Sequence, residues 1–183
     1  RGVREGDVLS VVVHKLGALR VIVLDEDGKA SPGATVQISS AVLWPSRRAE
    51  TDKDGNVLIG GLAEGAYALR AAKGDRASET EIAVSLDRGA EKEVTLRLGA
   101  GARISIHVVE NDADHAPIRG AAMVVAEGGL SAFPIEGSTG KDGRVAVGPV
   151  ARSAVVIVSA RATGYVSKSL AIDPASATTA EIA

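Results

Sequence analysis

Two stretches of the sequence place oxygen-bearing side chains at the close spacing that calcium sites use. These residues are Asp25, Asp27, Asp52, Asp54 and Asn56. Calcium takes roughly six to eight oxygen ligands, and loops on a rigid scaffold can supply them. The standard calcium-loop pattern is absent, however, because no glutamate follows at the required spacing, and tight Asp-Gly turns need the same residues without a metal. We therefore expect turns and no metal site here, and likewise none in the polar loop of Asp112, Asp114 and His115.

Nucleophilic catalysis requires a serine, a histidine and an acid that converge. The histidines of the chain are His14, His107 and His115. We predict that His14 lies in a linker, His107 on an outward strand face and His115 in a turn, and none of them has a nucleophile-elbow serine nearby. A hydrolase would need a cleft that gathers His107 or His115 with acidic side chains. We therefore expect no catalytic residue and no enzyme activity.

Trp44 is the strongest candidate for a binding residue, in a loop predicted over residues 43–49. An exposed tryptophan on a loop can stack on a sugar or anchor a protein partner. Phe133 is its expected counterpart in the second half of the chain, although the signal at both positions is weak. The competing interpretation is that Trp44 caps one open end of the fold as part of the core. Tyr67 matches a tyrosine corner and is expected in the core.

The composition excludes several classes of function. The net charge is −2 and the pI is near 6.0, with arginines scattered along the chain, so no nucleic acid or anionic membrane surface is expected as a partner. The absence of cysteine excludes disulfides, thiol catalysis and zinc sites with cysteine ligands. No apolar run approaches the ~20 residues of a membrane span, so no membrane insertion is expected, and nothing indicates a cofactor.

These candidate residues lie in turns between short apolar runs, and the order of the runs repeats. Residues 51–67 are predicted to form a turn, a strand, a second turn and a strand that opens at Tyr67; a weaker copy follows over residues 139–155. Short β-branched runs separated by Gly, Asp and Pro are typical of β-sandwiches. We predict an all-β chain of two tandem seven-stranded immunoglobulin-like (prealbumin-like) β-sandwiches, with no helix longer than about a turn.

The repeat also predicts the domain boundaries. Residues 16–99 form the first sandwich, called module one, and residues 100–183 form a second, divergent one, called module two. Residues 1–15 are expected to be the closing strand of a preceding module, or a linker, because a similar apolar run over residues 93–98 precedes module two. The chain is thus expected to be a piece of a longer array.

Module one carries a set of turn and core motifs. They are Asp25, Asp27-Gly28-Lys29, Pro32-Gly33-Ala34-Thr35-Val36, Thr51-Asp52, Asp54-Gly55, Leu62, Gly65, Tyr67 and Gly74. In this set the chain resembles the carboxypeptidase regulatory-like domain, a transthyretin-like (prealbumin-like) sandwich related to CnaB domains and grouped with carbohydrate-binding-like folds. Module two keeps Gly120-Ala121, Thr139, Asp142-Gly143 and Gly164-Tyr165. The resemblance implies a fold rather than a chemistry, because every motif is a turn or core element.

From these observations we expect non-enzymatic spacer or adhesion-type modules in a larger bacterial protein. The resemblance implies an extracellular, cell-surface or periplasmic location, and the expected partners are the neighbouring domains of the same chain. The alternative is a module that binds a glycan or a protein partner through the loops around Trp44 and Phe133. Replacing Trp44 with alanine separates the two, because loss of stability indicates a core role and loss of retention indicates a binding role.

Overall fold

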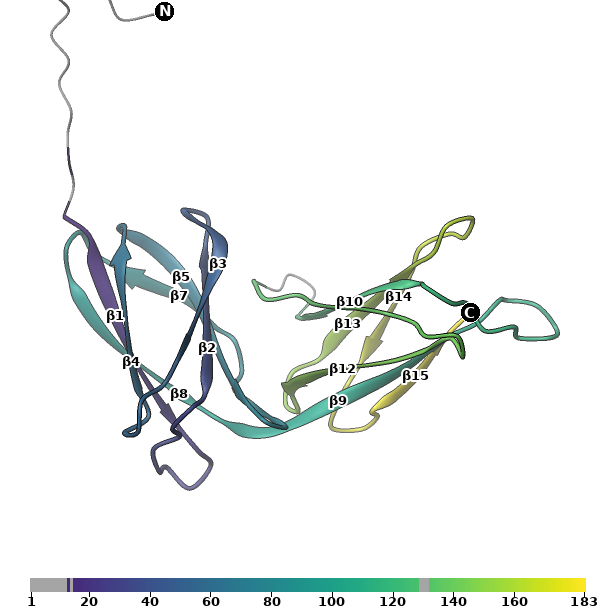
Figure 1. Cartoon of the computed structure of the whole chain (residues 1–183), viewed down its shortest axis with the longest axis horizontal. Helices are drawn as coiled ribbons and strands as arrows, with labels where there is room; N and C mark the ends of the chain where they lie inside the picture. The colour runs from purple at the N-terminus through teal and green to yellow at the C-terminus, as the bar shows by residue number, and fades with distance from the viewer. Residues whose placement is uncertain (1–12, 14, 129–131) are drawn as a thin grey trace, which may run out of the picture.

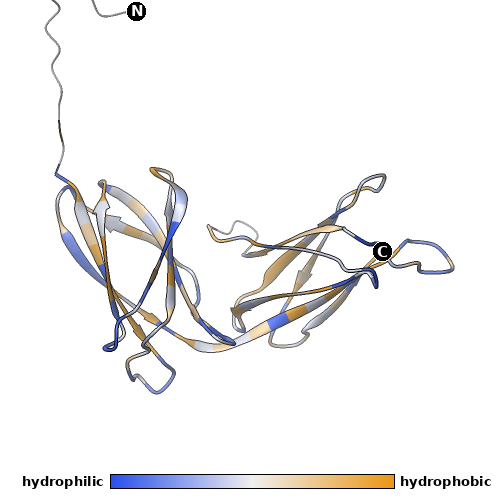
Figure 2. Ribbon diagram, viewed as in Figure 1, coloured by the Kyte–Doolittle hydropathy of each residue, from blue (hydrophilic) through white to orange (hydrophobic). Residues whose placement is uncertain are grey.

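The computed structural model describes residues 13, 15–128 and 132–183, and this part of the chain is built from β-strands and turns without a helix (Figure 1). The predicted all-β, immunoglobulin-like architecture is confirmed. Two separate groups of buried side chains form its cores, one in module one and one in module two. In Figure 2 the strands are largely hydrophobic and most turns are hydrophilic, as expected for sandwiches whose inner faces exclude water.

Module one contains eight of the described strands, one of which has only two residues. They are β1 (Gly17–Leu24), β2 (Thr35–Ser40), β3 (Leu43–Glu50), β4 (Asn56–Leu62), β5 (Gly65–Lys73), β6 (Arg76–Ala77), β7 (Glu81–Leu86) and β8 (Glu91–Arg97). One sheet has the order β4-β1-β8, with β8 parallel to β1. The other sheet contains β3, β2, β5 and β7. The core between them includes Leu19, Ile38 and Tyr67.

Module two contains seven of the described strands. They are β9 (Gly99–Val108), β10 (Ala122–Glu127), β11 (Ile135–Ser138), β12 (Arg144–Ala151), β13 (Val156–Arg161), β14 (Lys168–Ile172) and β15 (Thr179–Ile182). One sheet has the order β11-β10-β13-β14; the other pairs β12 and β15 with β9. The first residues of β9 also pair with β6, so a single sheet order, β12-β9-β6-β5-β2-β3, runs through both modules.

The repeated sequence block builds the same buried clamp in each module. In module one the Thr51 hydroxyl accepts a hydrogen bond from the Ala34 amide at 2.9 Å and donates one to the Ser31 carbonyl at 2.7 Å. In module two Thr139 bonds Ala121 and Ile118 in the same way, at 2.9 and 2.6 Å. Both threonines are buried, so the hydroxyl satisfies backbone groups that water cannot reach.

The Asp-Gly turns of the same block depend on glycine. Gly55 and Gly143 have φ angles of +75° and +68°, in the region that favours glycine. A Cβ atom at either position would also lie 2.8 or 2.6 Å from a carbonyl oxygen of the first strand, that of Val23 or Val108. The turn therefore holds the entry to the next strand directly against the opening strand of the module.

One predicted loop is wrong. Residues 43–49 were expected to form a loop around Trp44, but Leu43–Glu50 is strand β3. Strand β3 lies at the edge of its sheet and pairs with β2. Proline has no amide hydrogen to donate, and an edge strand tolerates it because one side of the strand has no neighbour to accept a hydrogen bond. Residues 1–12 and 14 lie outside the described residues, so the predicted strand over residues 1–15 stays a prediction. The boundary between residues 99 and 100 also stays one, because β9 begins at Gly99.

Candidate functional site

The structure places Trp44 in a different element from the one expected and Phe133 in the expected segment. Trp44 lies in the edge strand β3 rather than in a loop, and its role in binding stays a prediction. Phe133 lies in the segment before β11, as expected, but only 4% of its surface is exposed. A buried ring offers little surface to a ligand, and the role of Phe133 in binding stays a prediction.

The aspartates considered for calcium hold their own turns. Asp52 Oδ1 accepts hydrogen bonds from the amides of Asp54 and Asn56, both at 2.9 Å. Asp25 Oδ1 accepts two in the same way, from the amides of Asp27 at 3.0 Å and Lys29 at 2.9 Å. Within the described ranges, no group of three or more acidic or histidine side chains is placed to hold a metal ion.

Two histidines and an acid do come together on the outer face of module two. His107 Nδ1 lies 3.2 Å from Glu181 Oε2, and His115 Nδ1 lies 3.8 Å from Glu181 Oε1. The sequence did not predict this group, which depends on the parallel pairing of β15 with β9 that sets Glu181 opposite His107. A hollow of about 240 Å³ beside it is lined by Ser105 and Arg144, among others. The group lies on a sheet face where Glu181 is about half exposed, which provides no water-excluded pocket for a reacting bond.

The most extensive polar arrangement lies where the two modules meet. At its centre are two buried charged residues, Arg70 of β5 (3% exposed) and Glu127 of β10 (9% exposed), with Nη2 and Oε1 at 3.7 Å. Arg70 also donates a hydrogen bond to the Pro149 carbonyl. Glu127 Oε2 accepts one from the Thr80 hydroxyl at 2.8 Å, and its Oε1 accepts one from the Ala151 amide at 3.2 Å. The pair thus joins the modules through three contacts that cross between them: Arg70 with Glu127, Arg70 with Pro149, and Glu127 with Thr80.

Burial sets the electrostatics of this pair. Removal from water lowers the pKa of the Arg70 guanidinium from its ordinary value, and the Glu127 carboxylate opposes that shift. The Arg70 Nε atom is buried and has no hydrogen-bond partner among the described atoms. Two charges that have lost their hydration are held by each other, so removal of either one leaves the other uncompensated.

Backbone pairing reinforces the same junction. Arg76 and Ala77 of β6 pair with Ala100 and Gly99 of β9, and the Gly101 amide donates to the Asp75 carbonyl at 3.1 Å. A Cβ atom on Gly101 would lie 2.3 Å from that carbonyl oxygen, so the close approach of the two modules requires glycine here. Exposed polar contacts surround this strand pair, such as Arg103 Nε to Asp75 Oδ1 at 2.9 Å.

A cleft of about 430 Å³ lies beside the buried pair. It is lined by residues of both modules, namely Thr35, Gln37, Arg48, Arg70, Ala72, Pro134, Ile135, Glu136, Gly148 and Pro149. Arg48 follows Trp44 in β3, and Pro134 follows Phe133, so the two segments predicted to bind a ligand border one cleft. The sequence predicted both segments but not their proximity.

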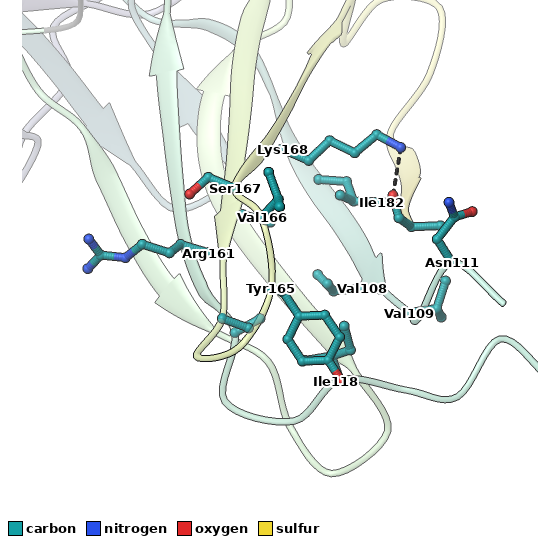
Figure 3. Close-up of a pocket in the computed structure, with 14 residues that line it drawn as sticks. Val108, Val109, Asn111, Ile118, Arg161, Tyr165, Val166, Ser167, Lys168 and Ile182 are labelled. Atoms are coloured by element: carbon teal, nitrogen blue, oxygen red, sulfur yellow. Dashed lines mark hydrogen bonds between the residues drawn. The ribbon is translucent and has the colours of Figure 1, made fainter.

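An apolar cavity of about 310 Å³ opens at the end of module two that faces away from module one (Figures 1 and 3). Val108, Ile118 and Ile182 line it, and Tyr165 and Val166 lie at its edge. Val166 is 95% exposed. The Tyr165 hydroxyl donates to Glu110, which raises the pKa of Tyr165 from its ordinary value. The volume is at the small end for ligand pockets.

Comparison with known families assigns module one. The model of the carboxypeptidase regulatory-like domain matches residues 18–99. Residues 18–99 of module one therefore resemble the carboxypeptidase regulatory-like domain. No curated protein matches the chain. The described residues include no helix long and apolar enough to cross a membrane.

Among solved structures, the chain is similar to the Bacillus anthracis TIE protein (15% identity, TM-score 0.41), covering 92% of this chain and 33% of that one. It is also similar to a streptococcal ancillary pilin (17% identity, TM-score 0.39), covering 86% and 58%. A third is GBS52, a minor pilin of Streptococcus agalactiae (13% identity, TM-score 0.40), covering 91% and 93%. The chain thus spans about a third of the first protein and less than two thirds of the second. At these TM-scores the similarity assigns no function to it.

The junction between module one and module two was missed from sequence. Arg70 alternates with apolar residues along β5, so it looked like a solvated residue on an outward face. The face does point outward from the core of module one, but module two covers it. The one available signal was Glu127, an acid at the end of an otherwise apolar strand. A single acid at the end of a strand does not by itself show that Arg70 of the other module meets it.

Proposed function

We propose that the chain is a non-enzymatic structural spacer, built of adhesion-type modules, in a larger exported or cell-surface bacterial protein. Its two modules, over residues 16–99 and 100–183, hold a fixed angle to each other and so present whatever they carry at a set distance and direction. The observation that carries the proposal is the junction, where one sheet order and the buried Arg70–Glu127 pair join both modules. The exported location rests on the resemblance of module one to its family.

Bending the junction would break several contacts between the modules at once. Swinging module two away would break the β6–β9 strand pairs and separate Arg70 from Glu127. The hydrogen bonds lost with them would cost about 0.5–1.5 kcal/mol each, and about 1.5–3 kcal/mol where a charged group takes part. Domains joined by a flexible linker alone lack such a term and reorient freely. A fixed angle is useful to a spacer, because a flexible tether would not set direction.

Spin labels in the two modules test this proposal. The chain has no native cysteine, so Lys53→Cys and Lys141→Cys give unique attachment sites in equivalent exposed turns. Double electron–electron resonance should give one narrow distance distribution for this pair. Arg70→Met should broaden it, whereas Arg103→Met, which removes only an exposed contact, should leave it narrow. A broad distribution in the otherwise unchanged chain would refute a fixed junction.

A second candidate function is supported by the cleft between the modules. We propose that an acidic glycan or a protein segment binds there, because Arg48 is exposed in a cleft that Pro134 also borders. Pull-down against polysaccharides and envelope extracts, with and without calcium, provides the test. Retention that is lost in both Arg48→Ala and Trp44→Ala supports this function. Retention that is unchanged in both variants, or absent altogether, contradicts it.

A further inference from the structure

The strand pairings of the two modules identify residues that occupy equivalent positions. Ala34 and Ala121 occupy the same place, since each amide donates to the repeated threonine hydroxyl. Counting along the pairings β2–β5 and β10–β13 makes Ala72 equivalent to Arg161. Continuing through β5–β6 and β13–β14 makes β6 equivalent to residues 166–167.

The same procedure applies to the closing strands. Val23 and Val108 are equivalent, because each amide donates at 2.8 Å to the glycine of its Asp-Gly turn. Val23 pairs with Leu96 and Val108 pairs with Ile182, so the final strands β8 and β15 end at the same place in their modules. The cavity at the end of module two is therefore the counterpart of the end of module one.

In module one this end is covered by module two. The hollow at that end is lined by Leu24 and Leu96 on one side and by residues 151–153 of module two on the other. Ala77 is 2% exposed because its strand pairs with β9. In module two the equivalent segment, Val166-Ser167, is exposed and forms no strand, and the apolar cavity beside it is open (Figure 3).

The neighbouring sheet face differs between the modules in a way that specifies the partner. Arg70, which meets Glu127 across the junction, corresponds to Ser159, and Gln37 corresponds to Val124. Ser159 bonds Ser169 at 2.8 Å, and Val124 and Leu170 are each about two-fifths exposed. At the position of Arg70 this face offers the uncharged Ser159, so that position does not suit a buried carboxylate in the place of Glu127.

We propose that this end of module two is a docking surface for a further β-sandwich module. The partner module opens its first strand with small residues, as residues 99–101 do, and carries a neutral residue where module two has Glu127. Its first strand pairs with Val166-Ser167, and its turn equivalent to residues 151–153 covers the cavity beside Ile182. This inference rests on the proposed spacer function and extends the same junction to a second position.

The test appends a second copy of residues 98–183 directly after Ala183, because Arg97 and Ala183 are equivalent and the copy then begins in register. The copy carries Glu127→Gln to remove the charge that would face Ser159. Spin labels replace Lys141 in the original module and the matching lysine in the copy. The distance distribution should be narrow and centred where that of the Lys53–Lys141 pair is centred.

Matched variants of the copy separate docking from chance proximity. Gly101→Val should broaden the new distribution several-fold, because its Cβ would clash with the hairpin it approaches, while Gly99→Ala, which meets nothing within 4 Å, should not. Val166→Asp in the original module should also broaden it. A broad distribution in the parent fusion, or one insensitive to Gly101→Val, would overturn the inference. The Lys53–Lys141 distance in the same molecules reports folding and the first junction, so the spacer proposal is judged separately.

Discussion

Gly101 provides the sharpest single perturbation of the junction. In Gly101→Ala the new Cβ would lie 2.3 Å from the Asp75 carbonyl oxygen and 3.1 Å from Pro149 Cβ. Ordinary contact requires more than 3.4 Å, so the Asp75 turn must retreat by about an ångström, which breaks the Gly101–Asp75 hydrogen bond and strains the β6–β9 pairs. Overpacking of this kind costs about 1–3 kcal/mol, and a lost hydrogen bond adds about 1 kcal/mol. We expect a loss of roughly 2–4 kcal/mol.

Gly99→Ala is the matched control. Gly99 lies in the same strand and pairs with Ala77, but a Cβ atom there meets nothing within 4 Å. Its backbone needs no left-handed conformation, so alanine should be neutral or stabilising by up to about 1 kcal/mol through the unfolded state. Thermal unfolding followed by calorimetry should therefore show a decrease of roughly 4–16 °C for Gly101→Ala and no decrease for Gly99→Ala. Equal effects of the two substitutions would show that the junction is not closely packed, and the reasoning above would fail.

Three further predictions concern the buried groups. Arg70→Met should destabilise the chain by about 3–5 kcal/mol in urea unfolding, because Glu127 stays buried without its partner. Arg103→Met, which removes an exposed ion pair, should cost less than about 1 kcal/mol. Similar losses in the two variants would contradict a buried pair. Thr51→Val should lower the stability of module one by about 1–3 kcal/mol, because the Ala34 amide loses its acceptor. Thr139→Val should do the same in module two, where the Ala121 amide loses its acceptor. A negligible change in the hydrogen-exchange protection of the affected module would refute the clamp. Burial raises the pKa of Tyr67, and the hydrogen bond to Glu110 raises the pKa of Tyr165, so ultraviolet titration should place the ionisation of both above 10.0. A raised tyrosine pKa stabilises the fold only while the tyrosine is protonated, so stability should decline as the pH rises past 10.0. Tyrosines that titrate normally would contradict the structure.

The sequence predicted the architecture well because turns and cores are local signals. The Asp-Gly turns, the repeated threonine and the alternation in β2 each arise from a few neighbouring residues, and the structure places them as expected. The loop predicted around Trp44 failed for a reason that is not local. Pro45 indicates a loop in isolation, but an edge strand tolerates it, and which strand lies at the edge depends on the whole sheet.

The junction could not be predicted in the same way. Arg70 and Glu127 are far apart in sequence; Arg70 lies on the outward face of β5, and Glu127 shares the alternation of the buried residues of β10. Only the angle between the modules brings them together, and that angle follows from β9 pairing with β6 through the small residues at its start. The same holds for Glu181 and His107, whose contact depends on a parallel strand pairing. Phe133 was predicted in the correct segment, but its burial depends on tertiary packing that the local sequence does not show.

The central claim is that the two modules move as one body. Residual dipolar couplings measured on backbone amides of the whole chain test it most directly, because each module reports its own alignment in the same sample. The account predicts that couplings from module one and module two fit a single alignment tensor of common magnitude and orientation. Two tensors of clearly different magnitude would mean that the modules reorient independently, and the fixed junction would be contradicted.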